Sequence, residues 1–291
     1  FLYWLECCRN NPEFDWLILT DDKNDFPYPP NVKVEYTTLK ELKKRIEARM
    51  ECQVALEKPY KLCDYKPLYG WLLEEELKDY THWGYGDMDL LFGKLSNFIT
   101  DEILEHYTKV SMLGHLSIMK NTARVNCAFQ QCNWKSIFQT HRICVFDEVR
   151  VEPNINAILE NMGLNVLSTL PYADIDSTHY NFHQWEYKRG NRTTKCRYVP
   201  NLYRYVEGKL FKIELKNHSL VEEEIAYVHF QKRRVAFPET VMQRYLLVPN
   251  KIISDRYLSE KDMRSYCCDD LKYTMQKTTE WIWNGVKKRL I

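Results

Sequence analysis

The sequence lacks any apolar run long enough to cross a membrane. A spanning helix needs roughly 20 consecutive apolar residues, and the apolar runs here stop well short of that length. Residues 1–10 contain Glu6 and Arg9 and do not follow the charged, then apolar, then small order of a secretory signal. We therefore expect a protein that is neither exported nor inserted, and that works in the cytoplasm.

The sequence also lacks an excess of charge and a cysteine framework. Lysine and arginine total 41 against 40 aspartate and glutamate, so the net charge of +1 gives no reason to expect a nucleic-acid partner. Ten cysteines are too few for a disulfide scaffold in 291 residues, which favours reduced thiols. With 45% hydrophobic residues, the chain can form one large domain or two small ones.

Two aspartates lie within an aromatic, glycine-rich run, Trp-Gly-Tyr-Gly-Asp-Met-Asp-Leu-Leu-Phe-Gly at residues 83–93. On an extended strand residues i and i+2 point to the same side, so Asp87 and Asp89 would face one site. Paired carboxylates suit Mg²⁺ or Mn²⁺, which keep positions open for substrate phosphates. This predicts a divalent-cation site and the chemistry of nucleotide-sugar transfer. The alternative is a strand that ends in a solvated turn, and a second triplet, Asp174-Ile175-Asp176, shows that the pattern alone is not specific.

The first half of the chain alternates predicted strands and helices. Apolar or alternating runs predict strands at 15–22, at 31–36 and up to Asp87, while helical spacing predicts helices from Thr38 to Met50 and over 60–77. This order is typical of an α/β sheet whose chemistry lies at the carboxyl edge. Further along, the predicted helices are 101–110 and 153–163, and 110–118 is predicted to be extended.

The second half reads as short strands followed by a helix. The predicted strands are 164–167, 196–199, 202–206, 210–215 and 226–230, with a hairpin turn at 206–209. A final helix is predicted over 269–289, with tryptophans and a basic end. Such a helix either rests on an anionic membrane or docks on its own domain.

Three segments together resemble a known group of proteins: Lys-Pro-Tyr-Lys-Leu-Cys-Asp-Tyr-Lys-Pro-Leu-Tyr-Gly at 58–70, the run at 83–93, and Tyr-Val-His-Phe-Gln-Lys-Arg at 227–233. Over nearly its whole length the chain resembles uncharacterised glycosyltransferase-like proteins of bacterial capsule and surface-polysaccharide gene clusters. More distantly it resembles the GT-A mannosyl- and galactosyltransferases. One departure is that these relatives have a strand ahead of the helix that residues 1–9 would form.

The resemblance implies a GT-A-like, Rossmann-like mixed sheet flanked by helices, with a β-rich and helical C-terminal extension. It implies a transferase domain over 1–235, with a donor half over about 1–100 and an acceptor half over about 101–235. Residues 236–291 would be a helical extension packed on that domain.

The resemblance also implies roles for single residues. Asp87, Asp89 and His229 would hold the metal ion, and Asp87 would in this way also bind the donor. Lys232 and Arg233 would hold the diphosphate, because both supply charge-assisted donors to phosphate oxygens. Asp64 would bind the donor sugar.

Some of these positions have a second interpretation. For Asp64 it is an exposed helix carboxylate paired locally with Lys61. Asp147 and Glu148 follow the apolar run 143–146, where a partly desolvated carboxylate could act as the catalytic base, or they could cap the helix predicted at 153–163. His115 would line the acceptor cleft or simply pack.

The function expected from the sequence is a glycosyltransferase that depends on Mn²⁺ or Mg²⁺. It would move a sugar from a UDP- or GDP-linked donor to a surface polysaccharide or a lipid-linked oligosaccharide, with a peripheral contact at the inner face of the membrane through the last helix. Two rivals remain open: a sugar-phosphate transferase, and a non-catalytic carbohydrate-binding or assembly protein with the same fold.

Overall fold

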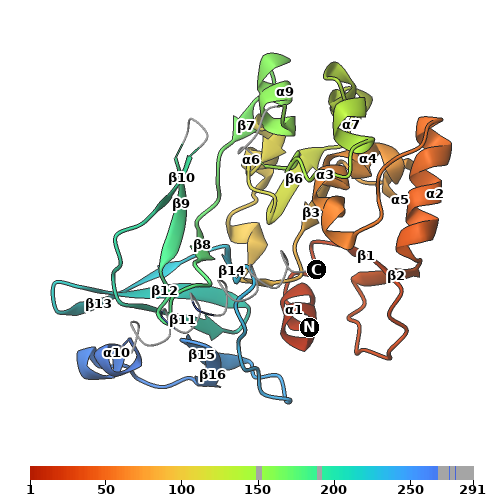
Figure 1. Ribbon diagram of the computed structural model, residues 1–291. Helices are drawn as coiled ribbons and strands as arrows, with labels where there is room; N and C mark the ends of the chain where they lie inside the picture. The colour runs from red at the N-terminus through yellow and green to blue at the C-terminus, as the bar shows by residue number, and fades with distance from the viewer. Residues whose placement is uncertain (149–152, 189–191, 268–274, 276–278, 280–291) are drawn as a thin grey trace.

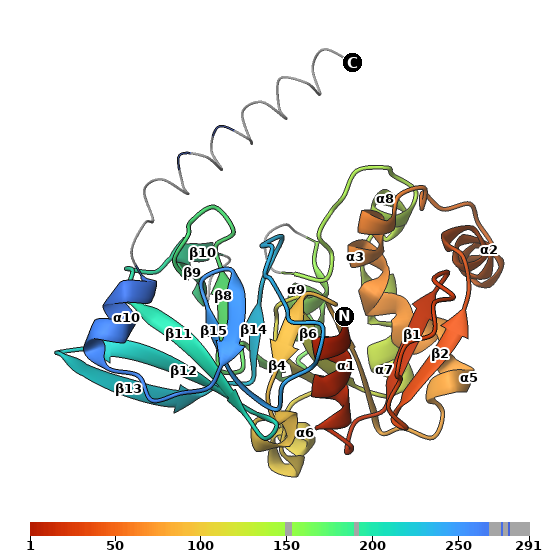
Figure 2. The same ribbon diagram turned by 90° about the horizontal axis from the view of Figure 1, so that it is seen from below.

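The computed structural model describes residues 1–148, 153–188, 192–267, 275 and 279. They form a mixed α/β protein with a parallel strand pair, two larger sheets that mix parallel and antiparallel neighbours, and one antiparallel sheet. Figures 1 and 2 agree on the layout: a β-rich part lies to one side, a part with most of the helices to the other, and β4 and β14 lie between them. Apart from residues 275 and 279, the helix predicted at 269–289 lies outside the described residues.

The N-terminal elements follow the prediction closely. After α1 (Leu2–Arg9), the parallel pair β1 (Trp16–Thr20) and β2 (Val32–Tyr36) leads into α2 (Leu39–Met50). The Thr38 hydroxyl accepts the Glu41 N–H, and the Glu41 carboxylate accepts the Thr38 N–H. This reciprocal cap satisfies two N–H groups that a helix start leaves without intrahelical partners.

The helical stretch predicted over 60–77, with Pro67 as a bend or as the start of its regular part, is helical but more broken than expected. The structure has a chain of short turns: η1 (Pro59–Lys61), α3 (Leu62–Tyr65), η2 (Lys66–Leu68), α4 (Tyr69–Leu72) and α5 (Glu74–Leu77). Pro67 cannot donate the backbone hydrogen bond that a continuous helix needs. Gly70 lies so close to β3 that a Cβ there would come within 2.3 Å of the Trp83 ring. The broken segment therefore fits tightly against β3.

A four-stranded sheet in the order β3-β6-β5-β7 backs these turns. Its strands are β3 (His82–Gly86), β5 (Lys109–Val110), β6 (Leu116–Lys120) and β7 (Val166–Leu167). Around it lie η3 (Leu95–Asn97), α6 (Asp101–His106), α7 (Ala123–Asn126), η4 (Ala128–Gln131), α8 (Lys135–Phe138) and α9 (Ile155–Asn161). The strand predicted at 143–146 does not form, and this stretch is irregular.

The sheet that matters most for the site has the order β10-β9-β8-β14-β4. Its strands are β4 (Leu90–Phe92), β8 (Tyr172–Ile175), β9 (Gln184–Lys188), β10 (Arg192–Lys195) and β14 (Tyr227–His229). Strand β14 runs parallel to β8, with His229 opposite Asp174, and antiparallel to β4, with His229 opposite Leu90. Three segments far apart in sequence thus meet at one end of β14.

An antiparallel sheet in the order β13-β12-β11-β15-β16 completes the β-rich part. It contains β11 (Asn201–Val206), β12 (Lys209–Lys216), β13 (Ser219–Glu224), β15 (Arg244–Val248) and β16 (Lys251–Ser254), and α10 (Glu260–Tyr266) follows. The predicted hairpin turn at 206–209 is confirmed, whereas 196–199 is irregular rather than a strand. Because β15 pairs with β11, the described part of 236–291 extends this sheet as well as supplying a helix.

Two hydrophobic clusters support the two parts of the molecule. One includes Leu90, Phe92 and the buried faces of the β-rich sheets, and the other includes Trp83 and Tyr85 of β3. The turn from β3 to β4 therefore crosses from one cluster to the other. Among the described residues no helix has both the length and the apolar character needed to span a bilayer.

Candidate functional site

Asp87 and Asp89 lie in the turn that joins β3 to β4. β3 ends at Gly86 and β4 begins at Leu90, so the pair follows the strand instead of lying on it. The Asp87 N–H donates to the His115 carbonyl at 2.8 Å, which fixes the start of the turn, and Met88 between the two acids is 49% exposed. The turn directs both carboxylates toward the end of β14, although the strand geometry expected for them is not present.

His229 brings an imidazole to the same place. Its Nε2 lies 3.4 Å from Asp89 Oδ1 and 4.0 Å from Asp87 Oδ2, and one ligand atom from each residue can be chosen so that all three lie within 4.8 Å of one another. The strand register explains this, since His229 is opposite Leu90, and the Phe230 N–H donates to the Asp89 carbonyl at 3.0 Å. The three residues that the resemblance implies as metal ligands are therefore together.

Asp174 holds the other side of the imidazole. Its Oδ1 lies 2.8 Å from His229 Nδ1 and also accepts a hydrogen bond from Gln231 Nε2 at 2.9 Å. Burial opposes the charge of His229, but Asp174 and Asp89 outweigh it and raise the pKa of His229 to about 9. A metal ion would have to displace the Nε2 proton of this ring, and Asp174 on Nδ1 then fixes the tautomer and leaves Nε2 for the cation. His115 stacks on His229 with ring centroids 4.0 Å apart, and its Nδ1 lies 3.5 Å from the Tyr227 hydroxyl.

The donor set fits a hard divalent cation. Around an octahedral ion with ligands at about 2.1 Å, neighbouring ligand atoms are about 3 Å apart and opposite ones about 4 Å apart. The distances from His229 Nε2 to the two carboxylates, 3.4 and 4.0 Å, lie close to this range. Two carboxylates and one imidazole suit Mn²⁺ and leave positions for substrate oxygens. Asp87, Asp89 and His229 are therefore the residues that would hold the ion.

Lys66 provides a positive charge beside this cluster. Its Nζ lies 2.7 Å from Asp87 Oδ1 and 3.1 Å from Asp147 Oδ2, and it donates to the Gly114 carbonyl at 2.9 Å. Burial alone would lower the pKa of Lys66, but Asp147 and Asp87 outweigh it and raise the value above the ordinary range. An ammonium that stays charged here can interact with phosphate oxygens as well as with the two acids.

Asp147 is a buried carboxylate next to Lys66. It is 2% exposed, and its Oδ1 has no hydrogen-bond partner among the described residues. Burial, together with the charge of the half-buried neighbour Glu148, raises the pKa of Asp147 to about 7 against the opposing effect of Lys66. The helix-cap interpretation of these acids is wrong, because the Asn154 side chain caps α9.

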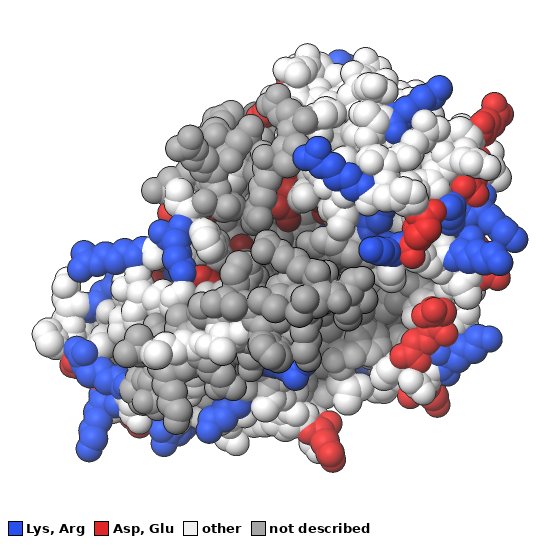
Figure 3. Space-filling view, in the orientation of Figure 1, with Lys and Arg blue, Asp and Glu red and all other residues white. Residues whose placement is uncertain are grey.

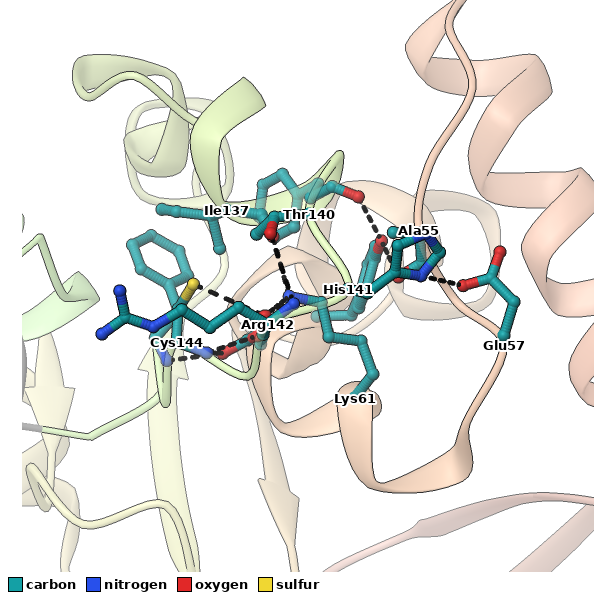
Figure 4. A network of polar contacts seen from close by, with 12 residues as sticks. Ala55, Glu57, Lys61, Ile137, Thr140, His141, Arg142 and Cys144 are labelled. Carbon is teal, nitrogen blue, oxygen red and sulfur yellow. Dashed lines mark hydrogen bonds and ion pairs between the residues drawn. The ribbon is translucent and has the colours of Figure 1, made fainter. Parts of the chain in front are cut away.

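Asp64 is enclosed rather than exposed. Its carboxylate accepts the N–H groups of Cys144 and Phe146, and it pairs with Lys61 at 2.7 Å. Lys61 also donates to the carbonyls of Ile137 and Arg142 (Figure 4). The local pair with Lys61 is thus confirmed, and the exposed setting expected with it is wrong.

Lys232 and Arg233 separate into different settings. Lys232 is exposed, and its Nζ lies 5.2 Å from the centroid of the Tyr60 ring. Arg233 is buried: it donates to the carbonyls of Tyr180 and His179 and to Asn250 Oδ1. These contacts give Arg233 a structural role at the loop that follows β8, so its guanidinium is engaged by the protein and is not placed to bind phosphate.

Residues 1–256 match the model of a family of unknown function (DUF6625). The chain belongs to this family. No curated protein and no solved structure matches it. For this DUF6625 member, the geometry of the site is therefore the main guide to function.

Two important residues were missed from the sequence. Asp174 belongs to the second Asp-x-Asp triplet, which the sequence alone did not mark as part of the site. Its position near the end of a short apolar strand could have indicated it, because Asp87 and Asp89 also follow a strand. Lys66 lies two residues after Asp64, but its direction toward Asp87 depends on the break at Pro67. Only the fold could reveal that contact.

Proposed function

We propose that the protein is a metal-dependent glycosyltransferase that uses a nucleoside-diphosphate sugar as donor. In support, two carboxylates and one imidazole converge, a partly buried cation lies next to them, and a carboxylate with a pKa near neutrality lies next to that cation. A GT-A-like fold belongs to the same proposal. It is supported by strands whose ends carry the site and by the likeness to glycosyltransferase-like proteins of bacterial capsule clusters.

The ionic groups have complementary roles in this reaction. A divalent cation held by Asp87, Asp89 and His229 would neutralise the charge that develops on the departing diphosphate. Asp174 keeps the His229 ring oriented, so that Nε2 faces the two carboxylates. Lys66 lies beside Asp87 and would place its positive charge near the diphosphate, and Lys232 supplies a second ammonium beside Tyr60.

Asp147 is the proposed base that takes the proton from the attacking acceptor hydroxyl. A general base is most effective when its pKa is near the working pH, and the pKa of Asp147 is raised to about 7 by burial. Its buried Oδ1 has no hydrogen-bond partner among the described residues, so this oxygen has a free lone pair for a proton once the acceptor binds. Glu148, half-buried beside it, is the second carboxylate on this side of Lys66.

The acceptor remains the one expected from the sequence, a surface glycan or lipid-linked oligosaccharide. Figure 3 shows lysine and arginine spread around the edge of one face and interspersed with acids, and further acidic atoms near its middle. On the described part of this face no continuous basic surface is visible, so the proposal relies on local cations at the site.

The observation that carries the proposal is the convergence of Asp87, Asp89 and His229, with Asp174 on the far nitrogen of the imidazole. Calorimetry with UDP or GDP and Mn²⁺ tests it directly. We expect nucleotide binding that needs Mn²⁺ and is lost in Asp89→Asn, while the exposed Asp79→Asn variant binds like wild type. Metal-independent binding, or an unaffected Asp89→Asn, would refute the proposal.

Product analysis then separates the rivals. A glycosyltransferase releases a nucleoside diphosphate, whereas a sugar-phosphate transferase releases a nucleoside monophosphate. A non-catalytic carbohydrate-binding protein would release neither from any nucleotide sugar, with or without Mn²⁺.

A further inference from the structure

An irregular segment carries the proposed base. Residues 139–146 contain no helix or strand, so their backbone N–H and C=O groups lack the partners that regular structure supplies. Such groups must find other partners when they are buried. Around this segment, several of these partners come from just two side chains, Lys61 and Asp64.

The contacts form a compact clamp. Asp64 accepts the Phe146 N–H at 2.9 Å and the Cys144 N–H at 2.9 Å, while Lys61 donates to the Ile137 carbonyl at 2.8 Å and to the Arg142 carbonyl. The two side chains are only 3% and 0% exposed and lie 2.7 Å apart. One pair of opposite charges thus contacts the irregular segment at three points and the preceding helix α8 at a fourth.

We propose that Lys61 and Asp64 are positioning residues that hold segment 137–146 so that Asp147 lies against Lys66. The proposal rests on the proposed function in one respect only, the role of Asp147 as base. Asp64 is two residues before Lys66, and the Phe146 N–H that it binds is one residue before Asp147. The clamp and the cation that faces Asp147 therefore belong to one short stretch of chain, which sets the distance between Lys66 and Asp147.

This assignment replaces the donor-sugar role that the resemblance implies for Asp64. Both carboxylate oxygens of Asp64 already accept hydrogen bonds, and the side chain has no exposed surface to offer a sugar hydroxyl. Removing one partner of a buried pair leaves an uncompensated charge, whereas removing both is better tolerated. The pair can therefore be tested as a unit.

The test compares Asp64→Asn, Lys61→Met and the double variant with wild type. Hydrogen exchange over 137–147 reads the clamp without any need for activity, and we expect protection there to fall in all three variants while β3 and β4 stay protected. Glu57→Gln is the matched control, because Glu57 pairs with His141 of the same segment but at the exposed surface (Figure 4). It should leave exchange unchanged.

Kinetics and metal binding separate positioning from general damage. We expect Mn²⁺ affinity and the donor KM to stay near wild type, while kcat falls by about 10- to 100-fold, as for a misplaced catalytic group. The acid limb of the pH profile should move to lower pH, because Asp147 would become more exposed and its pKa, which burial raises, would fall. Unchanged exchange over 137–147, or donor KM rising with kcat constant, would overturn the proposal. If wild type transfers no sugar, the proposed function fails, and the exchange result still decides the clamp.

Discussion

At the scale of single residues, the orientation of one imidazole determines what the site can bind. His229 has a carboxylate on each side: Asp174 contacts Nδ1, and Asp89 lies near Nε2. Because an imidazole that donates through one nitrogen offers a lone pair on the other, Asp174 decides which nitrogen faces the cation.

Changing Asp174 to Asn should weaken metal binding without removing any ligand. Loss of such an outer partner typically costs about 10- to 100-fold in affinity, and we expect this range for Mn²⁺ measured by calorimetry. Asp176→Asn is the control within the same triplet, because Asp176 pairs with Lys195 and Thr178 instead. Equal affinities in the two variants would contradict the role given to Asp174.

The pH dependence of transfer should follow Asp147. Since burial raises the pKa of Asp147 to about 7 and a base works only when ionised, the rate should rise with pH up to about 7 and level off above it. Below that value each pH unit should lower kcat about tenfold. Above pH 7 Asp147→Asn should lose about 10²- to 10⁴-fold, the usual contribution of a general base, and this deficit should shrink as the pH falls and the wild-type base becomes protonated. An acid limb centred near pH 4 would point to an exposed carboxylate.

Asp87 and Asp89 were predicted from their spacing after an apolar strand, and His229 from the family resemblance; the structure brings the three side chains together. The sequence could not assign Asp64 or Arg233, because burial decides their roles. Both have the chemistry of a ligand-binding group, and both use it on nearby backbone.

At the scale of elements, the loop between β5 and β6 is as important as the strands. Gly114 in this loop touches Asp147 so closely that a Cβ would come 2.3 Å from Oδ2, and its carbonyl accepts a hydrogen bond from Lys66. A side chain of any size at position 114 would therefore displace the carboxylate or the loop.

Gly114→Ala should lower the rate of sugar transfer by more than its effect on the melting temperature can explain. The methyl group must push Asp147 away from Lys66, and a small misplacement of a catalytic group can cost about 10²-fold in rate. Steady-state kinetics beside a thermal melt give the comparison. Gly163→Ala is an unsuitable control because of its positive φ, whereas Gly86→Ala meets only ordinary contacts at 3.4 Å and should cost much less activity.

Elements with a local signature were predictable, and those defined by distant contacts were not. The cap at Thr38 and the hairpin at 206–209 are determined by residues that are close together in the sequence. The turns of 60–77 depend on Pro67 and on the close approach of Gly70 to Trp83, so their helical spacing was misleading. β8 and β9 have short pairings that single-sequence patterns do not reveal.

At the scale of the whole molecule, the candidate site joins the two hydrophobic clusters. β3 belongs to one cluster and β4 to the other, and the predicted ligands come from the turn between them and from β14. A cation bound there would contact both parts of the fold and should therefore raise the free energy of unfolding of each part.

Mn²⁺ should therefore raise the melting temperature. A ligand at 100 times its Kd stabilises the native state by about 2.7 kcal/mol, which corresponds to a shift of several degrees in a chain of this size. Scanning calorimetry with Mn²⁺, and again after chelation with EDTA, measures it. Asp89→Asn should show little shift, and a wild-type melting temperature that does not respond to Mn²⁺ would argue against the site.

The pairing of His229 with Asp174 on one side and Leu90 on the other also bears on how relatives could diverge. The chain leaves the site after β8 and returns to it at β14, and the described residues in between form β9, β10 and three strands of the antiparallel sheet, so only the loops that connect these strands could change length without moving a ligand. A slip of one position within 227–229 would instead present Val228 or Phe230 where the imidazole belongs. Family members should thus vary in those connecting loops and hardly at all in residues 227–229.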